Sequence, residues 1–249
     1  MVTEKTTLQA PTIGELVSQD WRKAEVFKKY GIDYCCGGKK TVAEACAKKG
    51  IEPAVVETEL EQVALRPQAG TGSGPNYNHW ELDFLADYIV NTHHHYVKEA
   101  VPFLEELSNK VARVHGGHRP ELLEIQQHAQ SVIDELTLHM HKEEVILFPY
   151  IKELAQAKKN GKSMARPPFG TIANPINMME AEHVSAGEDM EAIEELSDRF
   201  TPPDDACMSY RVLFAKLQEF QQDLHQHIHL ENNILFPKAL QLESELLKA

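Results

Sequence analysis

Two segments of the sequence repeat one pattern: HMHKEEVILFP at residues 139–149 and HIHLENNILFP at residues 227–237. They agree at both histidines, at the glutamate and at the closing Ile-Leu-Phe-Pro. Each contains His-x-x-x-Glu, and residues four apart on a helix lie one above the other on the same face. The repeat therefore predicts two helices that each direct a histidine and a glutamate toward one centre.

The residues around both repeats recur at steps of three and four, which is typical of helices with one buried face. His139 and Glu143 stand on that face, which continues to Ile146, and His227 and Glu231 stand on the equivalent face of the second segment. Burial of glutamate is unfavourable unless the carboxylate is paired or bound to a metal. A single such histidine is more often a core side chain with a hydrogen-bond partner, but the repetition favours metal ligation. Mixed imidazole and carboxylate ligands suit iron, manganese or zinc, and two bridging carboxylates imply two metals.

Four long segments with helical periodicity follow residue 78, which predicts an all-α fold with a four-helix bundle. The third segment carries His183 on its apolar face, so we predict that it is a further ligand. His141 and His229 lie about 200° around the helix from the histidine two residues before each, and we exclude both as ligands. The predicted helices cover residues 80–107, 120–155, 171–196 and 205–240.

The first of these segments has three consecutive histidines, His93, His94 and His95. His95 points away from the apolar face, whereas His93 and His94 flank it on either side. Periodicity alone does not choose between His93 and His94. His115 falls at the junction before the second helix, where a metal ligand and a solvated turn residue are equally consistent with the pattern.

The cysteines and the histidines are segregated along the chain. All 13 histidines follow residue 78, whereas Cys35 and Cys36 precede it in the segment GIDYCCGG. We predict a small helical domain at 1–66 with short helices near 12–20, 21–31 and 41–50, a Gly- and Pro-rich linker at 67–78, and the bundle at 79–249. Gly37 and Gly38 predict an open, mobile turn after the cysteine pair.

Composition limits the possible partners and location. The net charge is −13, from 25 Lys and Arg against 38 Asp and Glu, which disfavours binding to nucleic acid or to an anionic membrane surface. No segment approaches the roughly 20 apolar residues that cross a bilayer. The four cysteines are too few for a disulfide framework in a chain of 249 residues, so we expect free thiols and a cytoplasmic protein.

The combination of GIDYCCGG near the N-terminus with HMHKEE, MEAEH and HIHLENNILFP resembles the repair of iron centres family, the di-iron proteins that repair iron-sulfur clusters. The resemblance spans nearly the whole chain and implies a hemerythrin-like four-helix bundle. It further implies two iron ions bridged by two glutamates and an oxo group. The implied ligands are His94, His115, His139, Glu143, His183, His227 and Glu231, with His94 preferred over His93 from its spacing to His115 and to Pro102.

The same resemblance implies repair of clusters damaged by nitric oxide or oxidative stress. Damaged iron-sulfur proteins, nitric oxide or oxygen, and an electron donor are the implied partners, and family analogy suggests a homodimer. Cys35 and Cys36 are the candidate thiol pair that transfers iron or electrons; two ordinary, partly buried thiols are the alternative. A repair or iron-donor protein is favoured over a nitric oxide or peroxide reductase and over an oxygen or nitric oxide sensor.

Overall fold

The computed structural model describes residues 10–65 and 75–247, and the all-α fold class is confirmed. These residues form helices joined by turns and irregular segments, and their one β-type pairing is an isolated bridge between Thr12 and Thr41. The chain divides into two units, Met1–His79 and Trp80–Ala249. Most of the linker predicted at 67–78 lies outside the described residues.

The N-terminal unit is a set of short helices whose starts are encoded locally. Thr12 and Thr41 each accept a backbone N–H from the glutamate three residues later, and that glutamate accepts the threonine N–H in return. These reciprocal bonds satisfy N–H groups that have no partner inside the helix. The unit comprises α1 (Ile13–Gln19), α2 (Lys23–Lys29), α3 (Val42–Lys49), α4 (Pro53–Leu65) and the 3₁₀ turn η1 (Tyr77–His79).

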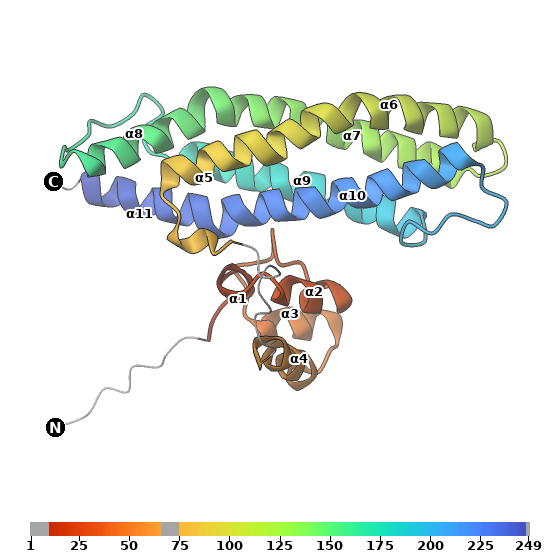
Figure 1. Ribbon diagram of the computed structural model, residues 1–249, viewed down its shortest axis with the longest axis horizontal. Helices are drawn as coiled ribbons and strands as arrows, with labels where there is room; N and C mark the ends of the chain where they lie inside the picture. Colours follow the sequence, from red (N-terminus) through yellow and green to blue (C-terminus); the bar gives the residue numbers. More distant parts are fainter. Residues whose placement is uncertain (1–9, 66–74, 248–249) are drawn as a thin grey trace. The chain divides into compact units, whose positions relative to one another are not determined.

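The second unit consists of four helical rods that lie lengthwise beside one another (Figure 1). Three of the rods are not continuous α-helices, because each contains one π-helical segment. The rods are α5 (Leu82–Ile89), η2 (Val90–His94) and α6 (His95–His115); α7 (Glu121–Lys142), η3 (Glu143–Leu147) and α8 (Phe148–Lys159); α9 (Ala173–Leu196); and α10 (Met208–Leu230), η4 (Glu231–Leu235) and α11 (Phe236–Leu246).

The π-helical segments fall where the ligand-type residues lie. The segments η3 and η4 begin at Glu143 and Glu231, and η2 ends at His94. A π-helical turn holds one more residue than an α-helical turn, so it shifts the phase of everything that follows. The prolines at 149 and 237, which have no N–H to donate, are the second residues of α8 and α11, the helices that follow η3 and η4.

This phase shift corrects one sequence prediction. Uniform helical periodicity placed Ile146 on the buried face, but the Ile146 side chain is 47% exposed and Leu147 is buried instead. The extra residue in η3 moves the buried position by one along the chain. Tyr150, by contrast, is buried, and its hydroxyl donates to Glu243 Oε1.

Across residues 10–65 and 75–247, no helix combines the length and the apolar character that a membrane span requires. The long helices instead bury one face and expose charged residues on the other. Phe148, Phe214, Phe220 and Phe236 are fully buried in the bundle, and the rings of Phe148 and Phe236 stack on those of His94 and His183.

Candidate metal centre

Six buried side chains converge in the middle of the bundle. They form two groups, His94, Glu143, His227 and Glu231 on one side, and His139, Glu143, His183 and Glu231 on the other. Within each group, one nitrogen or oxygen atom from every residue lies within 4.8 Å of the others. We call the six residues the histidine-glutamate cluster. Both glutamates belong to both groups, as expected if each carboxylate bridges two metal ions.

The Nε2 atoms of all four histidines face these two carboxylates. His94 Nε2 and His139 Nε2 both lie 3.3 Å from Glu143 Oε2. On the other carboxylate, Oε2 of Glu231 lies 3.1 Å from His183 Nε2, and Oε1 lies 2.9 Å from His227 Nε2. Each glutamate therefore stands between histidines from both groups.

The donor atoms of the cluster fit a bound metal better than they fit an internal hydrogen-bond network. Both oxygens of Glu143, one oxygen of Glu231 and His94 Nε2 are buried without a hydrogen-bond partner. Unsatisfied buried carboxylate oxygens are strongly unfavourable. In addition, His139 Nε2 and His183 Nε2 lie 3.0 Å apart, a contact that a cation between the two rings would satisfy. Nitrogen and oxygen donors of this kind suit iron, manganese or zinc.

The charges in the cluster support the same conclusion. Burial alone would raise the pKa of Glu231, but the nearby imidazoles of His227 and His183 lower it well below its ordinary value. Burial would likewise lower the pKa of His94, yet Glu143 and Glu231 raise it to about 10. The cluster is thus arranged to balance two anions with positive charge, which metal ions provide when protons leave the histidines.

A second layer of residues orients three of the four rings through their Nδ1 atoms. His94 Nδ1 donates to Glu144 Oε1 at 2.8 Å, and His139 Nδ1 donates to Glu182 Oε2 at 2.9 Å. His183 Nδ1 donates to Asn232 Oδ1 at 2.9 Å. Such partners fix the ring orientation and raise the basicity of a metal-binding histidine.

Sequence reasoning missed these supporting residues, although the repeat contained a signal for two of them. Glu144 and Asn232 occupy the same place in the two copies, directly after Glu143 and Glu231. Glu182 directly precedes His183 in the motif MEAEH. The two copies differ at the position of Glu144 and Asn232, and only positions that are identical in both copies were interpreted as ligands.

The structure brings His94 into the cluster and keeps His93 outside both groups. His93 is nevertheless buried, and its Nδ1 donates to Asp223 Oδ1 at 2.8 Å. Both histidines lie in η2, where the π-helical turn departs from the 3.6-residue period. That departure explains why periodicity could not choose between them.

The prediction that His115 joins the other ligands is wrong for this structure. His115 is the last residue of α6, and His94, the last residue of η2, lies 21 residues earlier in the same rod. At 1.5 Å per residue, such a separation corresponds to about 30 Å along the helix axis. The Nε2 of His115 instead lies 3.1 Å from Cys207 Sγ. His141 and His229, which the sequence pattern excluded as ligands, also lie outside both groups.

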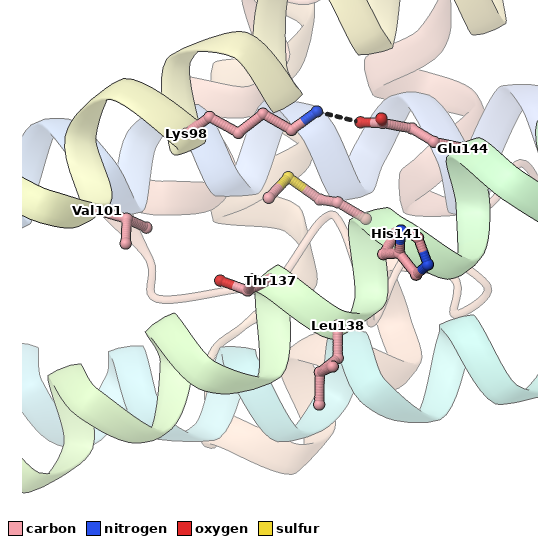
Figure 2. A pocket seen from close by; sticks show the side chains of 7 residues that line it. Lys98, Val101, Thr137, Leu138, His141 and Glu144 are labelled. Carbon is pink, nitrogen blue, oxygen red and sulfur yellow. Dashed lines mark hydrogen bonds and ion pairs between the residues drawn. The ribbon is translucent and has the colours of Figure 1, made fainter.

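A cavity of about 430 Å³ lies beside the supporting residues of His94. Figure 2 shows Lys98 on α6 extending across it to Glu144, whose carboxylate it contacts at 2.6 Å. Because Glu144 Oε1 also accepts the His94 Nδ1 proton, only one side chain separates the cavity from a ligand of the cluster. The remaining lining residues are Val101, Thr137, Leu138, Met140 and His141.

In the N-terminal unit, Asp33, Cys35 and Cys36 form a separate group, which we call the cysteine turn. Asp33 Oδ1 accepts the backbone N–H groups of Cys35 and Cys36 at 2.9 and 3.0 Å, and the Cys35 thiol at 3.1 Å. Both cysteines are thiols outside any disulfide, with Cys35 buried and Cys36 partly buried. The hydrogen bond with Cys36, burial and the Asp33 carboxylate raise the pKa of Cys35 well above its usual value.

The glycines after the cysteines form a bonded turn rather than the open one that we predicted. The Gly37 N–H donates to Asp33 Oδ2 at 2.7 Å, and the Gly38 carbonyl accepts the Gly14 N–H at 2.8 Å. A Cβ atom at Gly37 would lie 2.6 Å from the Asp33 carbonyl oxygen. Glycine is therefore required there for close approach of two backbone segments.

Two protein-family models match the chain, one in each of the two structural units. The model of the hemerythrin HHE cation binding domain matches residues 85–239, which contain the whole histidine-glutamate cluster. The model of a domain of unknown function, DUF542, matches residues 9–64, which contain the cysteine turn. The expected likeness of the bundle to hemerythrin is confirmed.

Curated relatives extend over nearly the whole chain. The iron-sulfur cluster repair protein YtfE of Musicola paradisiaca is 36% identical over 233 residues, which cover 94% of this chain and 97% of that protein. Proteins of the same name from Yersinia pseudotuberculosis and Yersinia pestis are 33% identical over 232 residues, or 93% of this chain and 97% of each relative. The similarity therefore includes both the cysteine turn and the metal centre.

Proposed function

This chain belongs to the family of iron-sulfur cluster repair proteins, and we propose that it repairs iron-sulfur clusters by supplying iron from a di-iron centre. The clients in this proposal are proteins whose clusters were damaged by nitric oxide or by oxidative stress. The described residues hold four thiols outside any disulfide, which agrees with a reducing compartment, and we propose the cytoplasm as its location.

The observation that carries the proposal is the sharing of Glu143 and Glu231 by two groups that each add two histidines. A single metal ion would leave one histidine pair facing a carboxylate without a cation. Two ions would place one cation in each group. We therefore propose His94, His139, His183, His227, Glu143 and Glu231 as the iron ligands, with two iron ions per chain.

The residues around the iron would control its retention and its accessibility. Ligation by nitrogen and oxygen alone, without thiolate, favours an iron pair that can be loaded and released, and bound iron would supply redox chemistry toward nitric oxide or oxygen. Glu144 and Glu182 hold the rings of His94 and His139 in place, and each also contacts a lysine, Lys98 and Lys142 respectively.

Cys35 and Cys36 are our proposed thiol pair for passing iron or electrons. The compact turn around Asp33 keeps Cys35 protonated at neutral pH, because its thiol pKa is raised. A metal ion arriving at the pair would displace thiol protons, since thiolates are the form that binds metals. Cys35 would therefore become a thiolate when a metal ion binds, and would not be a thiolate nucleophile in the metal-free protein at neutral pH.

The first test is the iron content of the whole chain, with Glu143→Ala and Glu231→Ala as variants and the exposed Glu106→Ala as a matched control. We expect wild type and control to bind two irons with an absorption band of an oxo-bridged ferric pair, and both glutamate variants to lose them. Iron-loaded protein should then reactivate a dehydratase whose cluster was damaged by nitric oxide. Zinc in place of iron, or glutamate variants with full iron, would overturn the proposal.

Turnover of nitric oxide or peroxide at the same centre is the second candidate. The cavity next to Glu144 favours it, because small molecules in that cavity come within one side chain of His94. Replacing Cys35 and Cys36 together separates both candidates from a simple gas sensor. A sensor would bind nitric oxide unchanged, whereas repair or reduction should fail if the thiols pass iron or electrons.

A further inference from the structure

The bundle has two halves, the first two rods and the last two rods. These halves repeat their supporting residues as well as their ligands. Glu144 and Asn232 follow the two bridging glutamates, and each holds the Nδ1 atom of the histidine on the preceding rod, His94 or His183. In both halves, therefore, the residue after the bridging glutamate has the same task. The correspondence predicts that the residues just before His94 and His183 are also equivalent.

The residue before His183 is Glu182, and it holds the ring of His139, which belongs to the other half of the bundle. His139 Nδ1 donates to Glu182 Oε2 at 2.9 Å, and Glu182 also forms an ion pair with Lys142. The equivalent position before His94 is His93, and the equivalent ring is that of His227. The two rings are stacked, with centroids 5.7 Å apart and planes 8° from parallel.

Stacking does not supply the hydrogen bond that Glu182 supplies in the other half. His227 is fully buried, and its Nδ1 atom has no hydrogen-bond partner. The Nδ1 of His93 is already bonded to Asp223, and its Nε2 is also buried without a partner. Of the four cluster histidines, His227 alone therefore lacks a supporting hydrogen bond among the described residues.

We propose that His93, standing in the place of Glu182, makes the iron position formed by His94 and His227 the one that releases its metal first. His93 is a positioning residue in this proposal, because it acts on the metal through the His227 ring. Loss of a supporting partner of a metal-binding histidine weakens metal affinity by about 10- to 100-fold. The position formed by His139 and His183, with both rings supported, retains its iron longer.

This asymmetry rests on the proposed di-iron centre and assigns its iron ions different tasks. The iron held by His94 and His227 is the transferable one. The other iron stays in place and keeps Glu143 and Glu231 neutralised after the first has left. The cavity beside Glu144 and Lys98 lies on the side of the releasing position, since Glu144 supports His94.

The test is the release of iron from the fully loaded chain to a ferrous chelator under anaerobic conditions. Wild type should show two phases of equal amplitude with rates about 10-fold or more apart. His93→Glu, which introduces a carboxylate beside His227, should lower the rate of the fast phase toward that of the slow phase. Glu182→Gln should accelerate the slow phase, and His95→Gln, at an exposed neighbouring position, should change neither. One common rate in wild type, or an unchanged fast phase in His93→Glu, would overturn the proposal.

A second measurement needs no variant. Crystals of wild type treated with chelator until the fast phase is complete should keep anomalous scattering from iron between His139 and His183, and lose it between His94 and His227. The opposite pattern would overturn the assignment. Neither measurement involves an iron-sulfur client, so a protein with two release phases that repairs nothing would refute the proposed function and leave the asymmetry intact.

Discussion

The histidine-glutamate cluster and the cysteine turn are both built from ionisable side chains, but they differ in how those side chains are satisfied. In the bundle, carboxylate oxygens and imidazole nitrogens are buried without hydrogen-bond partners. In the N-terminal unit, one carboxylate, Asp33, accepts three backbone N–H groups and a thiol. The bundle thus needs a ligand to complete its core, whereas the turn is complete within the chain.

The largest effect expected from this difference is on stability after metal removal. Metal that binds only the folded bundle stabilises it by about 4 kcal/mol when free metal is about 1,000 times its Kd. We expect chelation to accelerate amide hydrogen exchange in η3 and η4, with little change at residues 33–42 of the N-terminal unit. Equal acceleration in both units would break the comparison, because it would make the cysteine turn dependent on metal as well.

A smaller effect is expected from Gly37→Ala, which tests the completeness of the turn. The added Cβ would lie 2.6 Å from the Asp33 carbonyl oxygen, so the backbone must move at a cost of about 1–3 kcal/mol. Gly117→Ala is the matched control, because a Cβ there meets nothing within 4 Å. Denaturant unfolding followed by Trp21 fluorescence in a Trp80→Phe background measures the change. Equal stability of both variants would show that the turn tolerates rearrangement.

The smallest effect concerns reactivity alone. The raised pKa of Cys35 keeps its thiol protonated at neutral pH, so the thiolate that reacts with iodoacetamide forms only as the pH rises toward that pKa. Exposed Cys207 should therefore be alkylated first at pH 8, and the Cys35 rate should keep increasing above pH 9. Peptide mass spectrometry follows each site. Labelling of Cys35 as fast as Cys207 at pH 8 would contradict the hydrogen-bonded state of the turn.

The sequence predicted the all-α fold and the convergence of five side chains, because these depend on residues that repeat at helical spacing. His139 with Glu143 and His227 with Glu231 each share a helix face, and His183 lies on an uninterrupted α-helix. For these residues, periodicity and structure agree. Recognition of the family added His94, which periodicity alone had left level with His93.

Where sequence reasoning failed, uniform helical geometry was the wrong assumption. The π-helical turns shift by one residue the positions whose side chains face the core, so Ile146 is exposed where a regular helix would bury it. The placement of His115 failed because the first rod runs on to that residue, far from the cluster. The supporting bonds of Glu144 and Glu182 depend on packing between rods, which no single-segment pattern contains.

The π-helical turns also bear on how the bundle tolerates insertions and deletions. A π-helical turn is equivalent to an α-helix that has gained one residue. A single-residue deletion there would convert the π-helical turn into a regular α-helical turn and leave α8 or α11 in the phase in which it packs. A single-residue deletion inside α8 or α11 would instead rotate the residues after it by about 100° and turn apolar side chains toward solvent. The extra residue in each π-helical turn therefore shapes the backbone at Glu143 and Glu231, whereas the length of the flanking α-helices determines which of their residues are buried.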